Sequence, residues 1–411
     1  MRLYWIWFAH HPELTDGERA RLLEHFRDPE EIFFAEGRSD IPEELEGLVR
    51  KALSSRDLSQ AERVLDRCAR EEIGLLTYGE KEYPFRLKNI PDPPMVLYYK
   101  GDFPAVDQLP VIGIVGTRHA SAYGLSVAGK MGFQIARCGA AVVSGMALGI
   151  DAMAMRGALT GNGPVIGVLG CGVDQIYPKS NRSLFEDMER YGCILSEFMP
   201  GTPPLKWNFP KRNRIISGLS CGVLVVEAPE TSGSLITARQ AAEQGRDVFV
   251  VPGNVDVPNF AGSYQLLRDG ATPVSCGWDV VGEYSALFPE RIRRDTLEMP
   301  CGAGFFQGES TPARVAQKAA SPVPATTLSG ETDKKDIDKE PSGLYSDVNK
   351  QMPKLTADEQ QIADALKDGP RLVDDVIAET GLTTGRMLAG MTMLELKGIL
   401  KRLPGKHIAL K

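Results

Sequence analysis

The residues best suited to hold a ligand lie between positions 206 and 218, where cations alternate with aromatic rings. They are Lys206, Trp207, Phe209, Lys211, Arg212 and Arg214. A cationic groove with aromatic platforms suits sequence-tolerant single-strand binding, because each stacked base contributes ~1–3 kcal/mol and the arginine fork grips phosphate. We therefore expect phosphate contacts from Lys211, Arg212 and Arg214, and base stacking on Trp207 and Phe209. The alternative is that both rings pack inside the protein and the cations form a solvated helix start.

A turn with the composition of an anion site follows the first expected strand. Gly116, Thr117 and Arg118 come directly after the apolar run 111–115 and precede a helix expected to open at Ser121. Backbone N–H groups at a helix N-terminus attract phosphate, and an arginine adds a bidentate contact. The glycine spacing does not match the dinucleotide motif G-x-G-x-x-G. We expect phosphate binding here, and the alternative is an ordinary tight turn with an exposed arginine.

Two further segments offer anion contacts at strand ends. Ser232, Gly233 and Ser234 follow the apolar run 223–228 and form a second expected anion nest. Lys179 follows the third expected strand and is a plausible phosphate contact, with a solvated surface lysine as the alternative.

Three other polar residues receive structural interpretations. We expect Asp151 to hold its own loop and Asn181 to cap a helix. Glu227 ends a strand, and we expect it to orient a neighbouring arginine in preference to acting in catalysis.

Groups for acid–base or metal chemistry are scarce. The chain has five histidines, of which His119 alone falls in the region of alternating strands and helices. No serine or cysteine nucleophile has an evident basic partner, and no carboxylate–histidine cluster indicates a metal. We therefore expect binding without catalysis, with no catalytic residue, metal or cofactor.

Composition places the protein in the cytosol. The seven cysteines are scattered and form no C-x-x-C pair, which indicates reduced thiols. The apolar stretch 3–9 is too short for a membrane span and lacks the flanks of a signal peptide. We expect a soluble, cytoplasmic protein without membrane association.

Net charge is unevenly distributed along the chain. The formal charge is −7, and residues 1–75 hold 17 acidic against 11 basic side chains. The rest of the chain is close to neutral, so a local basic groove is compatible with the acidic total.

The elements that must position these residues follow from apolar periodicity. Short apolar runs alternate with helical segments at residues 111–115, 140–144, 164–169, 193–197, 223–228 and 248–253. Continuous apolar strands alternating with helices indicate a parallel sheet covered on both faces. The prediction is a doubly wound α/β domain, in which ligands bind outside the carboxyl ends of the strands.

The flanking regions differ in composition. We expect an acidic helical domain over residues 1–75, the α/β domain over 76–290, a flexible linker over 291–353 and a winged-helix domain over 354–411. Within the first domain, Pro12 to Leu14 is expected to open a helix and residues 58–70 to form another; proline-rich residues 83–101 are expected to be extended and not helical. The last domain is expected to hold a helix capped by Thr356, helices over 372–380 and 384–397, and a hairpin over 399–409.

Taken together, these segments resemble the DNA-processing protein A (DprA/Smf) family. The resemblance covers most of residues 75–280, and it rests on IVGTR (114–118), SGMALGID (144–151), GCGVDQIYPKSN (170–181), FPKRNRIISGLS (209–220) and SGSLITA (232–238).

The resemblance implies an extended Rossmann-like domain that binds single-stranded DNA, with a SAM or helix-hairpin-helix type N-terminal domain and a C-terminal winged helix. It further implies a homodimer that loads the recombinase RecA onto incoming DNA in natural transformation and works around single-strand binding protein. Carried over by position, Arg118, Lys179, Arg212 and Arg214 would line the phosphate pocket, with Lys211 beside them.

The sequence departs from the family pattern in two places. Met155 stands where the family usually has histidine, and Tyr264 stands where it usually has asparagine. The winged helix is also neutral, since residues 355–411 hold 8 basic and 8 acidic side chains. An ordinary DNA reader is more basic, so we hypothesise a protein-contact or weak duplex-binding role for it.

Two other functions compete with this interpretation. One is a Rossmann-like nucleotide hydrolase of the lysine-decarboxylase-like group, although the segment 230–234 lacks the paired glycines and following glutamate of that motif. The other is a winged-helix transcription factor whose α/β domain senses a small molecule.

Overall fold

The computed structural model describes residues 1–295, 355–367, 369, 371–397, 399–403 and 407–410. The chain divides into an N-terminal unit, described over 1–295, and a C-terminal unit, described from 355 on, each considered by itself. The predicted linker lies, from residue 296 on, outside the described residues.

The N-terminal unit opens with helices that bury the apolar stretch 3–9. Trp5, Ile6, Trp7 and Phe8 are all buried, because they sit where this first helix meets its neighbours and the sheet. The helices are α1 (Arg2–Ala9), α2 (Asp16–His25), α3 (Pro29–Phe33), α4 (Glu43–Ala52) and α5 (Ser59–Arg70). Helix α2 begins later than predicted, because Thr15 and Glu18 form a capping box there.

A mixed sheet forms the centre of this unit. Its strands are β1 (Gly74–Thr77), β2 (Val96–Gly101), β3 (Val111–Val115), β4 (Ala141–Ser144), β5 (Val165–Val168), β6 (Cys193–Ser196), β7 (Gly222–Val225), β8 (Asp247–Val250) and β9 (Thr272–Pro273). They lie in the order β1-β2-β6-β5-β4-β3-β7-β8-β9. Strands β3 through β9 run parallel to one another, whereas β2 pairs antiparallel with β6 and β1 pairs antiparallel with β2. The predicted strands correspond to β3 through β8, which confirms the doubly wound sheet.

The proline-rich segment 83–101 departs from the prediction. It contains the short helix α6 (Phe85–Lys88) and then strand β2. Pro84 occupies the cap position of α6, so proline precedes the helix and does not interrupt it.

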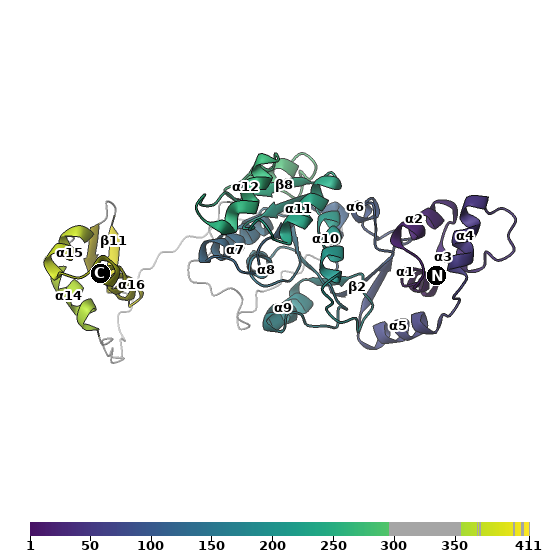
Figure 1. The fold of residues 1–411 in the computed structure, drawn as a ribbon, viewed down its shortest axis with the longest axis horizontal. Coiled ribbons are helices and arrows are strands. Elements are labelled where there is room, and N and C mark those ends of the chain that lie inside the picture. Colours follow the sequence, from purple (N-terminus) through teal and green to yellow (C-terminus); the bar gives the residue numbers. More distant parts are fainter. Residues whose placement is uncertain (296–354, 368, 370, 398, 404–406, 411) are drawn as a thin grey trace, which may run out of the picture. The chain divides into compact units, whose positions relative to one another are not determined.

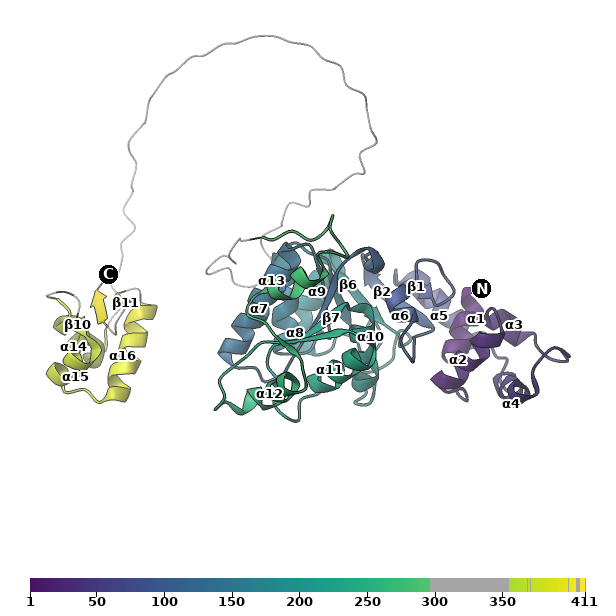
Figure 2. The same ribbon diagram turned by 90° about the horizontal axis from the view of Figure 1, so that it is seen from above.

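Helices cover both faces of the sheet (Figures 1 and 2). One face packs against α7 (Ala122–Arg137), α8 (Ile150–Thr160), α9 (Arg182–Tyr191) and α13 (Gly277–Val281). The other packs against α6, α10 (Asn208–Leu219), α11 (Ser234–Glu243) and α12 (Ala261–Arg268). Short 3₁₀ turns join them: η1 (Val106–Gln108), η2 (Lys179–Asn181), η3 (Pro258–Phe260) and η4 (Gly282–Tyr284).

The N-terminal helices share a core with the α/β region. The boundary expected between residues 75 and 76 falls inside β1, and one cluster of buried side chains runs from α1 through β2 into the sheet. At this junction the Nε2 atom of His10 lies 3.0 Å from the Tyr98 hydroxyl. Residues 1–295 therefore belong to one compact unit.

The C-terminal unit is a winged helix-turn-helix, as predicted. It contains α14 (Ala357–Ala365), β10 (Arg371–Leu372), α15 (Val373–Thr380), α16 (Thr384–Leu396), β11 (Leu400–Leu403) and β12 (His407–Leu410). Thr356 caps α14 in a capping box with Glu359, and Gly381 ends α15 in the left-handed conformation (φ 66°). The strands pair in the order β10-β12-β11.

Within the described residues, no helix combines the length and apolar character needed to cross a bilayer.

The junction at His10 predicts a pH dependence of folding. Burial, together with the nearby charges of Arg19 and Lys211, lowers the pKa of His10 from 6.5 to about 3. The unfolded chain therefore takes up a proton that the folded chain does not. The free energy of unfolding should fall as pH drops from about 6.5 toward 3, by at most about 1.4 kcal/mol per pH unit for this group. Thermal unfolding of the wild type and His10→Gln across this range checks the prediction: the variant should show the flatter dependence, and equal slopes would contradict it.

Candidate functional site

The candidate site lies where the strand order reverses. Strand β3 sits between β4 and β7, so the chain winds one way through β4, β5 and β6 and the other way through β7 and β8. A cleft of about 560 Å³, here called the strand-end cleft, opens at the carboxyl ends of these strands. Its lining comprises Val115, Gly116, Thr117, Arg118, His119, Ala147, Asp151, Tyr177, Lys206, Phe209, Pro210, Arg212, Asn213, Ile216, Pro229, Thr231, Ser232, Gly233, Ser234, Ile236 and Thr237.

The turn after β3 is held from behind by a buried carboxylate. Glu227 is fully buried and accepts hydrogen bonds from Ser121 N (2.9 Å), Ser121 Oγ (2.6 Å) and Asn259 Nδ2 (2.5 Å). Thr117 N donates to the Glu227 carbonyl at 2.8 Å. The prediction that Glu227 orients an arginine was wrong, because its carboxylate instead orients the β3–α7 turn. Arg118 is left exposed at the mouth of the cleft.

The loop after β4 is fixed by Asp151, as predicted. This buried carboxylate accepts a hydrogen bond from Gly145 N at 3.1 Å. Gly149 has a φ of 77° and packs against the backbone of Thr117 and Arg118, where a side chain would collide. The β4 loop therefore supports the β3 turn.

Arg212 is the most constrained cation of the site. It is only 4% exposed, and its Nη1 donates to the carbonyls of Val168 and, at 2.8 Å, Gly145. Burial lowers its pKa to about 10, and the nearby Asp151 carboxylate partly offsets that effect. Arg212 thus stays charged at neutral pH and ties the ends of β4 and β5 to helix α10.

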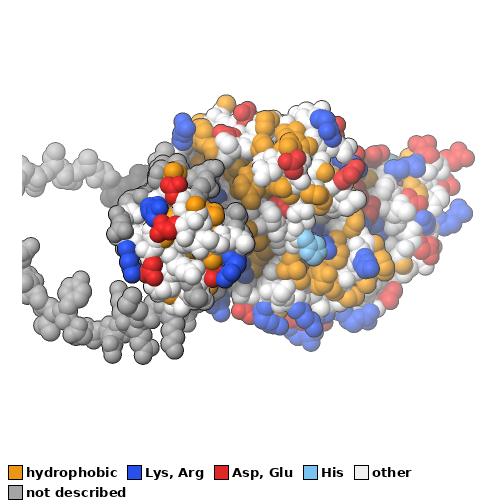
Figure 3. All heavy atoms as spheres, turned by 60° about the vertical axis from the view of Figure 1, so that its left-hand side comes forward, with side chains coloured by type: hydrophobic (Ala, Val, Ile, Leu, Met, Phe, Trp, Pro, Cys, Tyr) orange, Lys and Arg blue, Asp and Glu red, His pale blue; other side chains and the backbone are white. Residues whose placement is uncertain are grey.

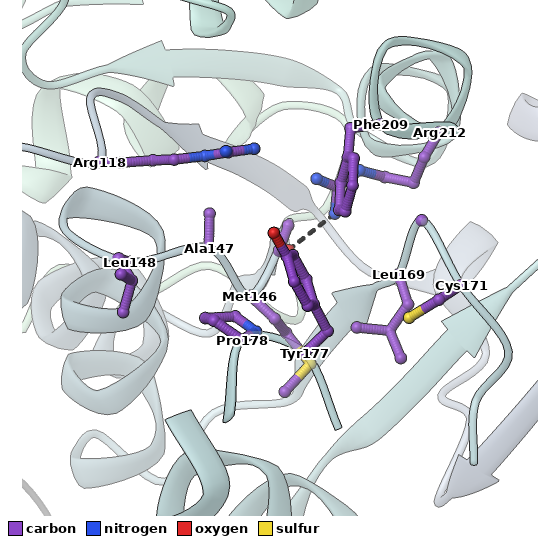
Figure 4. A pocket seen from close by; sticks show the side chains of 12 residues that line it. Arg118, Met146, Ala147, Leu148, Leu169, Cys171, Tyr177, Pro178, Phe209 and Arg212 are labelled. Atoms are coloured by element: carbon purple, nitrogen blue, oxygen red, sulfur yellow. Dashed lines mark hydrogen bonds between the residues drawn. The ribbon is translucent and has the colours of Figure 1, made fainter. Parts of the chain in front are cut away.

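A smaller recess, here called the side pocket, opens beside the strand-end cleft (Figure 4). Its lining comprises Arg118, Gly145, Met146, Ala147, Leu148, Leu169, Gly170, Cys171, Tyr177, Pro178, Phe209 and Arg212. The rings of Tyr177 and Phe209 lie 5.3 Å apart at 39°, and the Arg118 guanidinium sits 5.6 Å from the centre of the Phe209 ring. Both rings and the guanidinium offer flat faces to a planar ligand.

The turn before α11 forms a second polar wall. Ser232 Oγ lies 2.7 Å from Ser234 Oγ, and Ser234 N donates to Ser232 Oγ at 3.3 Å. Ser232, Gly233 and Ser234 all line the strand-end cleft at the start of this helix. The helix N-terminus adds a partial positive charge there.

The periodicity of α10 divides the predicted basic segment between two faces. Phe209, Arg212, Asn213 and Ile216 share the face that lines the strand-end cleft. Lys211 and Arg214 lie on the other face and meet acidic groups. Sequence spacing alone did not separate these faces.

Several predicted contacts therefore lie elsewhere. Arg214 is buried and pairs with Glu197 (2.7 Å) and Asp92 (3.0 Å), and Lys211 pairs with Asp16 of α2 at 2.7 Å. The predictions of phosphate contacts at Arg214 and Lys211 find no support in this geometry. The reason is that neighbouring carboxylates already neutralise both cations.

Lys179 and Trp207 also fall outside the lining of both recesses. Lys179 is exposed at the start of η2, and Trp207 is 71% exposed just before α10. Asn181 does not cap α9 with its side chain; its Nδ2 donates to the carbonyls of Met146 (3.0 Å) and Ala147 (3.3 Å).

Sequence reasoning missed Tyr177 as a site residue. It lines both recesses and pairs with Phe209, although 32 residues of sequence separate the two. The available signal was an aromatic residue directly after a strand-end loop and two positions before the predicted phosphate contact Lys179.

The departures from the family pattern have local explanations. Met155 is fully buried beneath the sheet, where its side chain lies close to Gly167. Tyr264 donates a hydrogen bond from its hydroxyl to the Gly253 carbonyl at 2.5 Å. Neither side chain lines the two recesses.

Apolar groups form much of the surface beside scattered cations and acids on the face shown in Figure 3. Among the described residues that line the two recesses, Leu148, Tyr177 and Ile236 are between 38% and 40% exposed. Within the described residues, no group of three or more His, Cys, Asp and Glu side chains is arranged to hold a metal.

Comparison with known proteins identifies the family. The family model described as DNA recombination-mediator protein A matches residues 74–285, and the DprA winged helix domain matches residues 349–406. The chain belongs to the DNA recombination-mediator protein A family. Protein Smf of Synechocystis sp. is similar to this family member over nearly its whole length, with 33% identity across 98% of this chain and 97% of the relative.

Two further similarities support the assignment of this chain to the DNA recombination-mediator protein A family. DNA processing protein DprA of Bacillus subtilis is 45% identical over 229 residues, which cover 56% of this chain and 76% of the relative. The X-ray structure of DprA from Streptococcus pneumoniae superposes with a TM-score of 0.58 at 33% identity, covering 69% of this chain and 98% of that one. The predicted family and Rossmann-like fold are confirmed.

The ion pairs of Arg214 predict a structural role for this residue. Arg214→Ala should lower the free energy of unfolding by ~3–5 kcal/mol, because the buried Glu197 carboxylate loses both hydrogen bonds from Arg214 and keeps only Lys211 at 4.0 Å. Lys211→Ala, at a 40% exposed side chain, is the control and should cost at most ~1 kcal/mol. Chemical denaturation measures both values. Equal, small losses would show that the buried pair contributes little.

Proposed function

We propose that this protein binds single-stranded DNA in the strand-end cleft and acts as a recombination mediator without catalysing a reaction. The observation that carries the proposal is the meeting of two polar helix-start turns with the Tyr177–Phe209 pair and Arg118 in one cleft. Polar turns suit phosphates, and aromatic faces suit bases. The family's description as a recombination mediator, and the name DNA processing protein carried by the relative from Bacillus subtilis, point the same way.

Different walls of the cleft would bind the backbone and the bases of the DNA. Thr117, Arg118 and the Ser232–Ser234 turn would hold the sugar–phosphate backbone, with Lys206 at the start of α10 adding charge. Tyr177 and Phe209 would stack bases. Lys179 and Trp207 would contact the DNA only outside the cleft. Arg212 would contribute its positive charge from its buried position.

This arrangement favours binding over chemistry. The ionisable side chains of the described cleft lining are Arg118, His119, Asp151, Tyr177, Lys206 and Arg212. Asp151 is committed to the Gly145 amide and Arg212 to two carbonyls. Of the other four, Arg118 and Lys206 are cations that can bind phosphate, and His119 and Tyr177 have no carboxylate beside them in this lining to form a paired acid and base.

The resemblance extends the proposal to partners. We propose that the protein forms homodimers and loads RecA onto DNA taken up in natural transformation, in the presence of single-strand binding protein. In an organism without DNA uptake, the same activity would serve recombinational repair.

The first prediction concerns DNA binding. Phe209→Leu should weaken binding of a labelled oligothymidine about tenfold by loss of one stacking face. Arg118→Ala should weaken it and reduce the slope of log affinity against log salt by about 0.7, the value for one lost phosphate contact on a single strand. Fluorescence anisotropy across salt concentrations measures both.

Trp207→Leu is the matched control, since this ring is 71% exposed and lies outside the cleft lining. It should change affinity less than either cleft variant. If the wild type fails to bind at low salt, the proposal is wrong, and release of base from nucleoside monophosphates then becomes the assay for the hydrolase alternative.

The second prediction concerns mediation. RecA filament formation on DNA already coated with single-strand binding protein should accelerate with wild-type protein and not with Arg118→Ala, because loading requires the mediator to hold the strand. DNA-dependent ATP hydrolysis by RecA follows filament formation in real time. Acceleration by neither protein would restrict the function to DNA binding.

A further inference from the structure

The two aromatic rings of the strand-end cleft depend on different loops. Tyr177 belongs to the segment between β5 and η2, here called the β5 loop (169–178). Phe209 follows the segment between β6 and α10, here called the β6 loop (197–207). The ring centres lie 5.3 Å apart (Figure 4). Neither loop contains a helix or strand, so the placement of the rings depends on contacts that join one loop to the other.

The carboxylate of Asp174 joins the two loops. Its Oδ1 accepts a hydrogen bond from Gly201 N at 2.8 Å, and its Oδ2 accepts one from Gln175 Nε2 at 2.8 Å. The backbone adds a second link, since Gly172 N donates to the Thr202 carbonyl at 2.9 Å. The side chain of Asp174 is only 8% exposed, so its bonds are largely shielded from water.

Arg67 of helix α5 holds this carboxylate from the N-terminal helical region. Its Nη2 donates to Asp174 Oδ2 at 2.8 Å, and its Nε donates to Glu71 Oε1 at 2.8 Å on the same helix. Its Nη1 lies against Gly201, where an added Cβ atom would come within 2.5 Å of it. Gly201 has a φ of 91°, which favours glycine and leaves room for the guanidinium. One guanidinium therefore contacts both loops.

Helix α5 contacts the β6 loop at a second point. Gln60 donates from Nε2 to the Met199 sulfur at 3.6 Å. Gln60 and Arg67 are seven residues apart, which places them on the same face of the helix. The helix itself is anchored by side chains buried in the shared core, namely Ala61, Val64 and Cys68. It therefore offers a fixed support to the loops.

We propose that Arg67 is a positioning residue of the DNA site and that, by holding Asp174, it fixes the two aromatic rings relative to each other. The proposal rests on DNA binding in the strand-end cleft. Asp174 stands three residues before Tyr177 in the β5 loop, and the β6 loop that it holds leads directly to Phe209.

The effect on binding follows from the order that the loops already have. A strand that stacks its bases on rings held in place does not need to order them on binding, and affinity is higher for that reason. Arg67 lies outside the lining of the cleft, so it would act through the loops and not by touching the DNA. The N-terminal helices would thereby contribute to a site to which they supply no lining residue.

The test measures binding of a labelled oligothymidine to the full chain across salt concentrations. Arg67→Ala should weaken binding about threefold, the order expected for one partly exposed ion pair. The slope of log affinity against log salt should stay at the wild-type value, because no phosphate contact is lost. Arg70→Ala is the matched control, since it removes the same charge from an exposed position of the same helix, and it should bind as the wild type does. Arg67→Lys, which keeps the charge, should recover part of the affinity.

A double-mutant cycle assigns the route of the effect. In a Tyr177→Leu background, Arg67→Ala should weaken binding less than it does alone, because the ring that it helps to place is absent. Asp174→Asn keeps an acceptor for Gly201 N and removes the charge that faces Arg67. Adding Arg67→Ala to Asp174→Asn should therefore cause little further loss.

Hydrogen exchange checks the loops in the absence of DNA. Arg67→Ala should speed amide exchange up to about fivefold in peptides from residues 169–178 and 197–207, since local opening there loses one ion pair. Peptides from β7 and β8 should exchange as in the wild type. Thermal unfolding shows that the variant retains its fold.

The outcomes separate this proposal from the one beneath it. Wild-type affinity of Arg67→Ala overturns the positioning role and leaves DNA binding in place. A salt slope smaller by about 0.7 in this variant indicates a direct phosphate contact and also overturns it. Losses that add fully with Tyr177→Leu exclude the route through the β5 loop. If the wild type binds no strand at low salt, the DNA-binding proposal is wrong; faster exchange confined to the two loops then still supports their support by Arg67, and unchanged exchange overturns it.

Discussion

The guanidinium of Arg212 joins the carboxyl ends of two neighbouring strands to a helix. Its Nη1 meets the carbonyls of Gly145, after β4, and Val168, at the end of β5, while its backbone belongs to α10. Removing an arginine from water is unfavourable, and the carbonyl bonds and the Asp151 carboxylate offset that cost. The β4 loop, the side pocket and the Phe209 ring all depend on this junction for their relative positions.

Helix α10 contributes to both the cleft and an ion-pair cluster, because its sequence places cations on both of its faces. The face with Phe209 and Arg212 lines the cleft, and the face with Lys211 and Arg214 meets the carboxylates of Asp16, Glu197 and Asp92. The acidic N-terminal region thereby touches the same helix that builds the candidate site. Part of the negative charge of this region, at Asp16, pairs with Lys211 of α10.

Much of the fold could be predicted because parallel strands buried on both faces leave a strong signal. Strands β3 through β8 and the winged helix were all expected from apolar runs and turn residues. Strands β1 and β2 were not expected, since they pair antiparallel at one side of the sheet and do not belong to the alternation of strands and helices. The core that α1–α5 share with the sheet around Tyr98 was not expected either, because it depends on contacts distant in sequence.

The site was only partly predictable for a related reason. Composition identified the turns at Gly116–Arg118 and Ser232–Ser234, whose chemistry resides in the backbone and in adjacent residues. It could not decide which cations of α10 reach solvent, because that depends on acids such as Glu197, which comes from another segment. Tyr177 was missed because its partner Phe209 approaches it only in three dimensions.

The edges of the central sheet bear on whether two molecules can join through their sheets. Strand β9 consists of Thr272 and Pro273, and proline has no N–H to offer an incoming strand. At the opposite edge β1 is only four residues long, and the ring of Tyr99 covers Gly74. Neither edge presents a long row of free donors and acceptors, which is the template for edge-to-edge aggregation. The edges of this sheet therefore do not favour pairing with the sheet of a second molecule.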